Sequence, residues 1–233
     1  MHRNKIGTQS LLKMKSKTDR PIGQWHRSLV GMPSVFPVIF AALVSFGLVL
    51  TEAKAGQTGD SFLISQQPTR APAGFQGLCA RYNWVCASSS NSGLSDATTM
   101  TKAKQVNLTV NRRVREIGDQ AQYGKVEHWA LPTKRGGDCE DLVLLKKKML
   151  LAQGIPSQSL LIATVLDREL NSHAVLIVRT QSGDQVLDNL TDRIVGWKKT
   201  GYTFLKMQNP SSLRNWDAVI AGGVISDRPT ASQ

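Results

Sequence analysis

The chain has 233 residues, 41% of them apolar, which fits a globular protein of one domain with an appended segment. Its formal net charge of +12 and its pI of about 9.9 would alone suggest binding to nucleic acid or to a membrane surface. However, residues 1–31 carry +6 of that charge, and the rest of the chain holds no nucleic-acid-binding motif. We therefore expect no nucleic-acid partner.

Residues 1–55 have the three parts of a secretory signal peptide. The basic region is followed by an uncharged apolar run, residues 35–50, and then by Ala53 and Ala55 in the small-x-small pattern of a cleavage site. We expect export and cleavage near Ala55. The alternative is an uncleaved leader, which would then be the membrane anchor. The true start of the chain is also open, since Met14 or Met32 would serve.

The next segments alternate between loops and helices. Residues 56–95 are rich in Ser, Gly, Gln, Pro and Ala and are expected to be loop-rich, with a flexible arm over 56–74. The apolar spacing predicts a helix over 96–115, followed by a glycine-containing loop over 116–137. Residues 139–153 are the strongest helix candidate, because one apolar stripe runs through them.

The second half of the chain is richer in β-branched and aromatic residues, which predicts strands. These strands are expected over residues 159–166, 173–180, 184–190 and 201–207. Residues 182–184, Ser-Gly-Asp, predict a tight hairpin turn between the second and third strand. A helix followed by adjacent strands predicts an α+β domain in which the helix packs on an antiparallel sheet.

Two of the three cysteines, Cys79 and Cys86, lie seven residues apart and can close a short disulfide loop in an oxidising compartment. That leaves Cys139 unpaired, and an unpaired thiol in an exported protein is a candidate reactive group. The alternative is a buried cysteine that acts as a small apolar residue. Metal binding by this thiol is disfavoured, because no CxxC or HxxxH spacing accompanies it.

Cys139, His173 and Asp188 stand in the order of a nucleophile, a base and an orienting acid. Cys139 opens the predicted helix, His173 opens one strand and Asp188 ends the next, so the hairpin should bring the last two together. A helix N-terminus and an imidazolium both lower the pKa of a thiol. We therefore predict a papain-like triad. The flanking acids, Asp138 and Glu140, should by contrast raise the pKa of the thiol.

These residues carry a resemblance to the bacterial transglutaminase-like cysteine proteinases. It rests on the stretches "RGGDCEDLVLLKKKMLLAQGIP", "HAVLIVRT", "VLDNLTDRIVGW" and "GYTFLKM". The resemblance spans roughly residues 75–220 and implies a transglutaminase/papain-like fold. We expect the domain over 75–222, with 223–233 left as a tail. It implies a periplasmic cysteine endopeptidase that forms a thioester acyl-enzyme and has a protein substrate, namely a surface adhesin of biofilms. Acyl transfer to an amine and a non-catalytic binding module on the same fold are the alternatives.

The resemblance also implies a calcium site and no organic cofactor. The ligands would include Asp138 and Glu140, and Asp141 could share the work. The alternative is that Asp138 caps the helix and the other two acids favour its first turn. In related folds a residue upstream of the nucleophile helps to build the substrate groove or the oxyanion site, a role open here to Trp129 or Gln122. The backbone N–H of Cys139 is the other candidate oxyanion donor.

Overall fold

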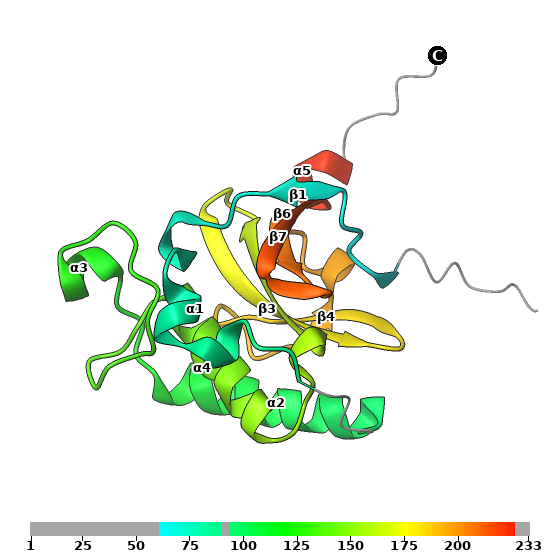
Figure 1. The fold of residues 1–233 in the computed structure, drawn as a ribbon, viewed down its shortest axis with the longest axis horizontal. Helices are drawn as coiled ribbons and strands as arrows, with labels where there is room; N and C mark the ends of the chain where they lie inside the picture. The colour runs from blue at the N-terminus through cyan, green and yellow to red at the C-terminus, as the bar shows by residue number, and fades with distance from the viewer. Residues whose placement is uncertain (1–60, 90–93, 227–233) are drawn as a thin grey trace, which may run out of the picture. The chain divides into compact units, whose positions relative to one another are not determined.

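A computed structural model describes residues 61–89 and 94–226 (Figure 1). The predicted signal peptide, its cleavage site and the candidate start positions lie outside the described residues, as do residues 56–60 and 227–233. Within the described ranges, no helix combines the length and the apolar character needed to cross a membrane.

The centre of the domain is one seven-stranded antiparallel sheet with the order β1-β7-β6-β2-β3-β4-β5. Its strands are β1 (Gln67–Thr69), β2 (Leu160–Leu166), β3 (Ser172–Thr180), β4 (Gly183–Leu187), β5 (Val195–Gly196), β6 (Thr203–Asn209) and β7 (Ser212–Ala221). The α-helices are α1 (Leu78–Arg81), α2 (Asp96–Arg113), α3 (Asp119–Tyr123), α4 (Cys139–Ala152) and α5 (Gly223–Ser226). Among the residues that the structure describes, four short 3-10 turns complete the elements: η2 (Ala73–Phe75), η3 (Asn83–Val85), η4 (Ser157–Ser159) and η5 (Trp197–Lys199).

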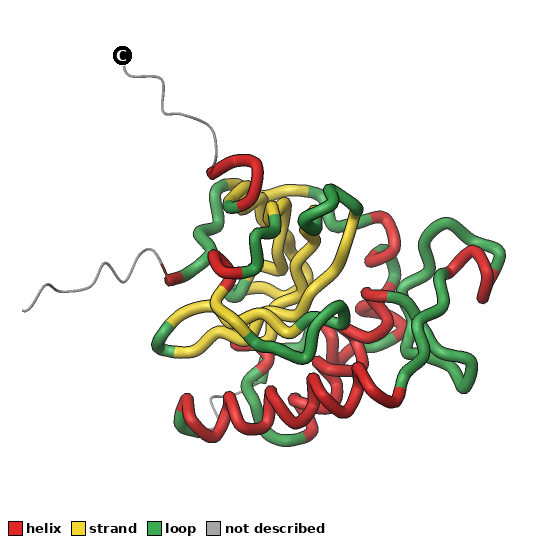
Figure 2. The backbone as a smooth tube through the Cα atoms, turned by 180° about the vertical axis from the view of Figure 1, so that it is seen from behind, coloured by secondary structure: helices red, strands yellow, loops and turns green. Residues whose placement is uncertain are grey.

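Helices α2 and α4 lie together on one side of the sheet (Figures 1 and 2). The strands alternate between two cores, as the period of two requires. In β2, Leu160 and Ile162 join the core shared with the helices, whereas Leu161 and Ala163 join a second core on the opposite face. Because both faces of the central strands are buried, these strands read as continuous apolar runs in the sequence.

The α+β prediction is confirmed, and the predicted helices over 96–115 and 139–153 differ from α2 and α4 by only one or two residues at the C-terminal end. Strand β4 is shorter than predicted, because the chain leaves the ladder at Leu187, before Asp188. Strand β7 was not predicted. It carries exposed Arg214 and Asn215 near its start, which interrupts the apolar pattern.

Part of the segment predicted to be a flexible arm is attached to the sheet. The side chain of Leu63 is buried in the second core, and its backbone N–H donates to Asp184 at 2.8 Å. Further along, β1 pairs with β7 in antiparallel register. The polar composition of this segment predicted loops, but edge pairing supplies the backbone hydrogen bonds that the local sequence does not.

Candidate active site

Cys139 is the first residue of α4 and follows two glycines that the backbone requires. Gly136 has φ = +133°, and a Cβ there would lie 2.0 Å from the carbonyl oxygen of Arg115. Gly137 donates its N–H to that same carbonyl at 3.1 Å. The glycines thus allow the loop to pass closely along residue 115 and deliver the thiol to the helix N-terminus.

His173 and Asp188 are in direct contact at the opposite side of the site. The Nε2 atom of His173 lies 2.9 Å from Oδ1 of Asp188, and both side chains are buried. The ladder between β3 and β4 pairs Leu176 with Leu187, so Asp188, the next residue, lies beside the start of β3. The predicted hairpin therefore accounts for this contact.

Asp188 is held as a carboxylate by three donors. Besides His173, the hydroxyl of Tyr202 donates to Oδ2 at 2.6 Å and the backbone N–H of Leu190 donates to Oδ1 at 3.0 Å. Burial alone would raise the pKa of Asp188, but these hydrogen bonds outweigh burial and hold the pKa below its ordinary value. The group therefore keeps its negative charge next to the imidazole.

The thiol of Cys139 lies between an acid and the strand of His173. Its Sγ donates to Oε2 of Glu140 at 2.7 Å. Burial, followed by the charge of Glu140 and this hydrogen bond, raises the pKa of the thiol far above its ordinary value, whereas the backbone N–H of Ala174 acts to lower it. Because Ala174 follows His173 in β3, the thiol lies against the beginning of that strand. Burial and the neighbouring acid thus both oppose formation of the thiolate.

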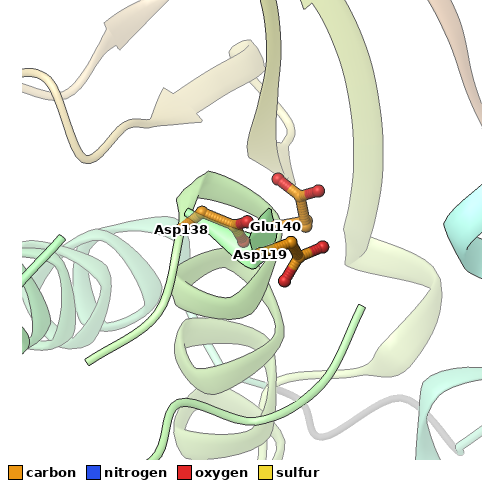
Figure 3. A group of neighbouring side chains, drawn as sticks. All are labelled: Asp119, Asp138 and Glu140. Carbon is orange, nitrogen blue, oxygen red and sulfur yellow. The ribbon is translucent and has the colours of Figure 1, made fainter. Parts of the chain in front are cut away.

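Three carboxylates gather at the N-terminal end of α4, as Figure 3 shows: Asp119, Asp138 and Glu140. Each offers one oxygen, and these oxygens all lie within 4.8 Å of one another. Burial, together with the charge of Asp119, raises the pKa of Asp138, and burial raises that of Glu140. Asp138 occupies the N-cap position of α4, but its side chain makes no capping hydrogen bond, and its Oδ1 is buried without a partner among the described residues.

These residues fit a calcium ion. Calcium takes carboxylate oxygens, and a divalent cation would offset the mutual repulsion of these carboxylates and satisfy the free oxygen of Asp138. Asp141 does not belong to this group: its Oδ1 instead accepts the backbone N–H of Ala130 at 2.7 Å, and burial raises its pKa to about 7. Its Oδ2 is buried without a hydrogen-bond partner among the described residues, so a share of Asp141 in a calcium site stays a prediction.

Residues 65–223 match the family of bacterial transglutaminase-like cysteine proteinases. The chain belongs to this family. It is therefore a transglutaminase-like cysteine peptidase, and the resemblance seen in the sequence is confirmed.

The proteinase is also similar to solved structures of LapG from Legionella pneumophila. Calcium-bound LapG has 20% identity and a TM-score of 0.45, with 67% of this chain and 86% of that chain covered. EGTA-treated LapG has 21% identity and a TM-score of 0.42, with 60% and 76% covered. A third LapG structure has 20% identity and a TM-score of 0.45, with 68% and 85% covered. Comparison with curated proteins finds no match.

Trp129 is a core residue of the proteinase and not the wall of an open groove. Its side chain is 2% exposed and contacts Phe75 and Trp216 edge to face. Its indole N–H donates to Glu127 at 3.1 Å, and a Cβ on Gly74 would overlap the ring. The groove role predicted for Trp129 is therefore wrong, because packing takes up the whole ring.

Gln122 supports the loop before the nucleophile. Its Nε2 donates to the carbonyl of Gly136 at 3.3 Å, and its Oε1 accepts from the hydroxyl of Thr133 at 3.0 Å. Both ends of the amide are thus bonded to the loop that leads into Cys139. These contacts make Gln122 a residue that positions the loop.

A disulfide joins Cys79 to Cys86, with a Cα–Cα distance of 5.6 Å. It links α1 to the residue that follows η3, and Cys86 is buried in the helix-side core. Cys139 is the one free cysteine among the described residues.

A buried polar layer lies between α2, α4 and the segment that follows β4. Asn111 of α2 donates to the backbone carbonyl of Asp188 at 2.9 Å, and Asn107 donates to that of Asp192 at 3.4 Å. Lys146 of α4 is fully buried, and its Nζ has no hydrogen-bond partner among the described residues. Burial lowers its pKa to about 7, partly offset by the charges of Asp188 and Asp192.

Sequence reasoning missed Asp119 and Tyr202. Asp119 lies nineteen positions before Asp138 and meets it only because the loop after α2 folds back, which no spacing rule encodes. Tyr202 lies in the stretch "GYTFLKM", which was used for the resemblance but given no role. A tyrosine just before a strand that borders the site was the available signal.

Proposed function

We propose that this proteinase is an exported endopeptidase in which Cys139 is the nucleophile, His173 the general base and acid, and Asp188 the orienting residue. The hydrogen bond between His173 and Asp188, with the thiol against the same strand, is the observation that carries the proposal. A complete set of the three groups favours catalysis over a binding module that has lost activity.

The geometry divides the two nitrogens of His173 between two tasks. Because Nε2 faces Asp188, Nδ1 is the nitrogen left to receive the proton of the thiol. The buried carboxylate stabilises the imidazolium that then forms. In this respect Asp188 acts through its charge, and the bond from Tyr202 preserves that charge.

The reaction that follows is an acyl transfer in two steps. The thiolate of Cys139 attacks the carbonyl carbon of the scissile peptide, and the backbone N–H of Cys139 at the helix N-terminus donates to the oxyanion. His173 gives its proton to the leaving amine, and a thioester remains. A water molecule, deprotonated by His173, then attacks the thioester, and the thiol leaves with a proton from the imidazolium.

Asp119, Asp138 and Glu140 would hold calcium in the active enzyme. A bound divalent cation would compensate the carboxylates that otherwise raise the pKa of the thiol. Bound calcium would then be a condition for activity. The negative charge of the acids next to Cys139 opposes formation of the thiolate, and the thiol donates a hydrogen bond to Glu140.

We also propose that the enzyme acts in the periplasm on a surface adhesin and so affects biofilms. Membership of the family and the signal-peptide pattern support this assignment. The test is incubation of the mature protein with candidate exported adhesins in the presence of calcium, with N-terminal sequencing of the fragments. We expect one defined cut that the Cys139→Ser variant does not make and an adduct on Cys139 that hydroxylamine releases. Incorporation of a labelled amine in place of hydrolysis would reassign the enzyme to acyl transfer. If no substrate gives an adduct on Cys139, the assignment of Cys139 as the nucleophile is contradicted.

A further inference from the structure

A pocket of about 350 Å³ opens beside the triad acid. Asp188 and Tyr202 line it, and so does Leu190, whose side chain is 53% exposed. Cys139 and His173 do not line it. The pocket is therefore separated from the reacting groups by one residue, since Asp188 contacts His173 on one side and the pocket on the other.

Three cationic side chains converge on this pocket from different segments: Arg168 from the turn between β2 and β3, Arg193 from the segment between β4 and β5, and Lys199 from η5. None of them forms an ion pair within residues 61–89 and 94–226. Arg168 donates through Nε to the carbonyl of Thr200 at 2.8 Å, which fixes its guanidinium at the pocket. Arg193 and Lys199 are exposed side chains.

The acids of the pocket compensate these cations only in part. Glu169 forms no ion pair within the described residues, and the carboxylate of Asp188 is already committed to donors from His173, Tyr202 and Leu190. Three positive charges against the two negative charges of Glu169 and Asp188 leave the concave surface with a net charge of +1. Such a surface attracts anions, and an arginine that is held in place favours a carboxylate in particular.

We propose that this pocket is a subsite for an acidic side chain of the protein substrate, held by Arg168, Arg193 and Lys199. The volume suits one or two side chains, and Leu190 offers an apolar contact for the methylene groups of a glutamate. A polypeptide chain bound for attack at Cys139 passes close to His173, and therefore close to the residue that forms a wall of the pocket. This inference rests on the proposed function, because it assigns the pocket to the substrate of that same site.

The test uses peptide binding to the mature chain carrying Cys139→Ser, so that cleavage does not interfere. Two fluorescein-labelled peptides, identical except that the glutamates of one are glutamines in the other, are titrated and followed by anisotropy. We expect the glutamate peptide to bind about tenfold more tightly, equivalent to about 1.4 kcal/mol. The double variant Arg193→Gln/Lys199→Gln should lose that preference.

The matched control is Lys148→Gln/Arg214→Gln, which removes the same charge from exposed side chains that do not line this pocket. It should keep the preference. Equal binding of the two peptides, or equal loss of preference in both double variants, would overturn the inference. Displacement of the peptide by an equal concentration of glutarate would assign the pocket to free small anions, which also contradicts a substrate subsite.

The failure of this inference can be told from failure of the proposed function. The same variants with the native thiol are treated with iodoacetamide in calcium. Rapid labelling of Cys139 together with equal binding of both peptides would overturn the subsite alone. Slow labelling would instead contradict the assignment of Cys139 as the nucleophile, whichever peptide binds more tightly.

Discussion

Replacement of Tyr202 by phenylalanine tests how the triad acid is kept charged. The hydroxyl donates to Asp188 at 2.6 Å, both side chains are buried, and a hydrogen bond to a charged group contributes about 1.5–3 kcal/mol. The ring itself remains, so the packing against His173 is retained. We therefore expect Tyr202→Phe to lower the free energy of unfolding by about 1.5–3 kcal/mol at neutral pH.

The pH dependence of this loss has a definite sign. The pKa of Asp188 is lower in the folded state than its ordinary value, so its contribution to stability is present at neutral pH and disappears as the pH falls through the folded pKa. Without the hydroxyl of Tyr202, that pKa rises. Acid-induced loss of stability should then begin at a higher pH in the variant than in the wild type.

A double-mutant cycle with Asp188→Asn isolates the pair. Denaturant unfolding of the four proteins should give a coupling energy of about 1.5–3 kcal/mol between the two positions. The control is Tyr82→Phe, whose hydroxyl only accepts a neutral N–H from Leu131 at 3.3 Å. It should cost about 1 kcal/mol or less and should not couple to Asp188→Asn. A coupling energy for Tyr202 below about 0.5 kcal/mol would refute the role of its hydroxyl.

Three further predictions concern the rest of the site. Lys146→Met should stabilise the protein by about 1–4 kcal/mol at neutral pH, because it removes a buried ammonium without a hydrogen-bond partner. Since burial lowers the pKa of Lys146 to about 7, the unfolded wild type binds more protons than the folded one between that pH and about 10.4. The difference in unfolding free energy between variant and wild type should therefore shrink as the pH rises, and an undiminished difference would contradict this. Calcium at about 100 times its Kd should raise the free energy of unfolding of the wild type and of the control Glu169→Gln by about 2.7 kcal/mol, but not that of Asp138→Asn. Thermal melts with and without EGTA measure this difference. Gly136→Ala should lower the free energy of unfolding by about 1–3 kcal/mol because of its φ and the Arg115 carbonyl, whereas Gly118→Ala, with open space at its Cβ, should change urea unfolding little.

Local patterns predicted the parts of this protein that are set by local physics. The apolar stripe predicted α4, and the turn at residues 182–184 predicted the hairpin of β3 and β4. The contact between His173 and Asp188 follows from that hairpin, because an antiparallel turn fixes which residues lie side by side.

Contacts that depend on distant segments could not be predicted in this way. Asp119 lies close to the acids of α4 because a long loop folds back. Tyr202 donates to Asp188 although β5 and η5 separate them in the sequence. Trp129 was assigned to a groove because its position upstream of Cys139 suggested it, but the residues that bury it, Phe75 and Trp216, come from opposite ends of the domain. Burial of this kind is a property of the packed domain and has no signature near Trp129.

The most direct test of the central claim is the rate at which Cys139 reacts with iodoacetamide at neutral pH. With calcium present, we predict labelling of Cys139 faster than that of a free thiol, slowed both by His173→Ala and by EGTA. In EGTA the rate should rise with pH, because burial and Glu140 raise the pKa of the thiol. Labelling in calcium that is no faster than a free thiol, or that is unchanged in His173→Ala, would contradict the assignment of Cys139 as a nucleophile activated by His173.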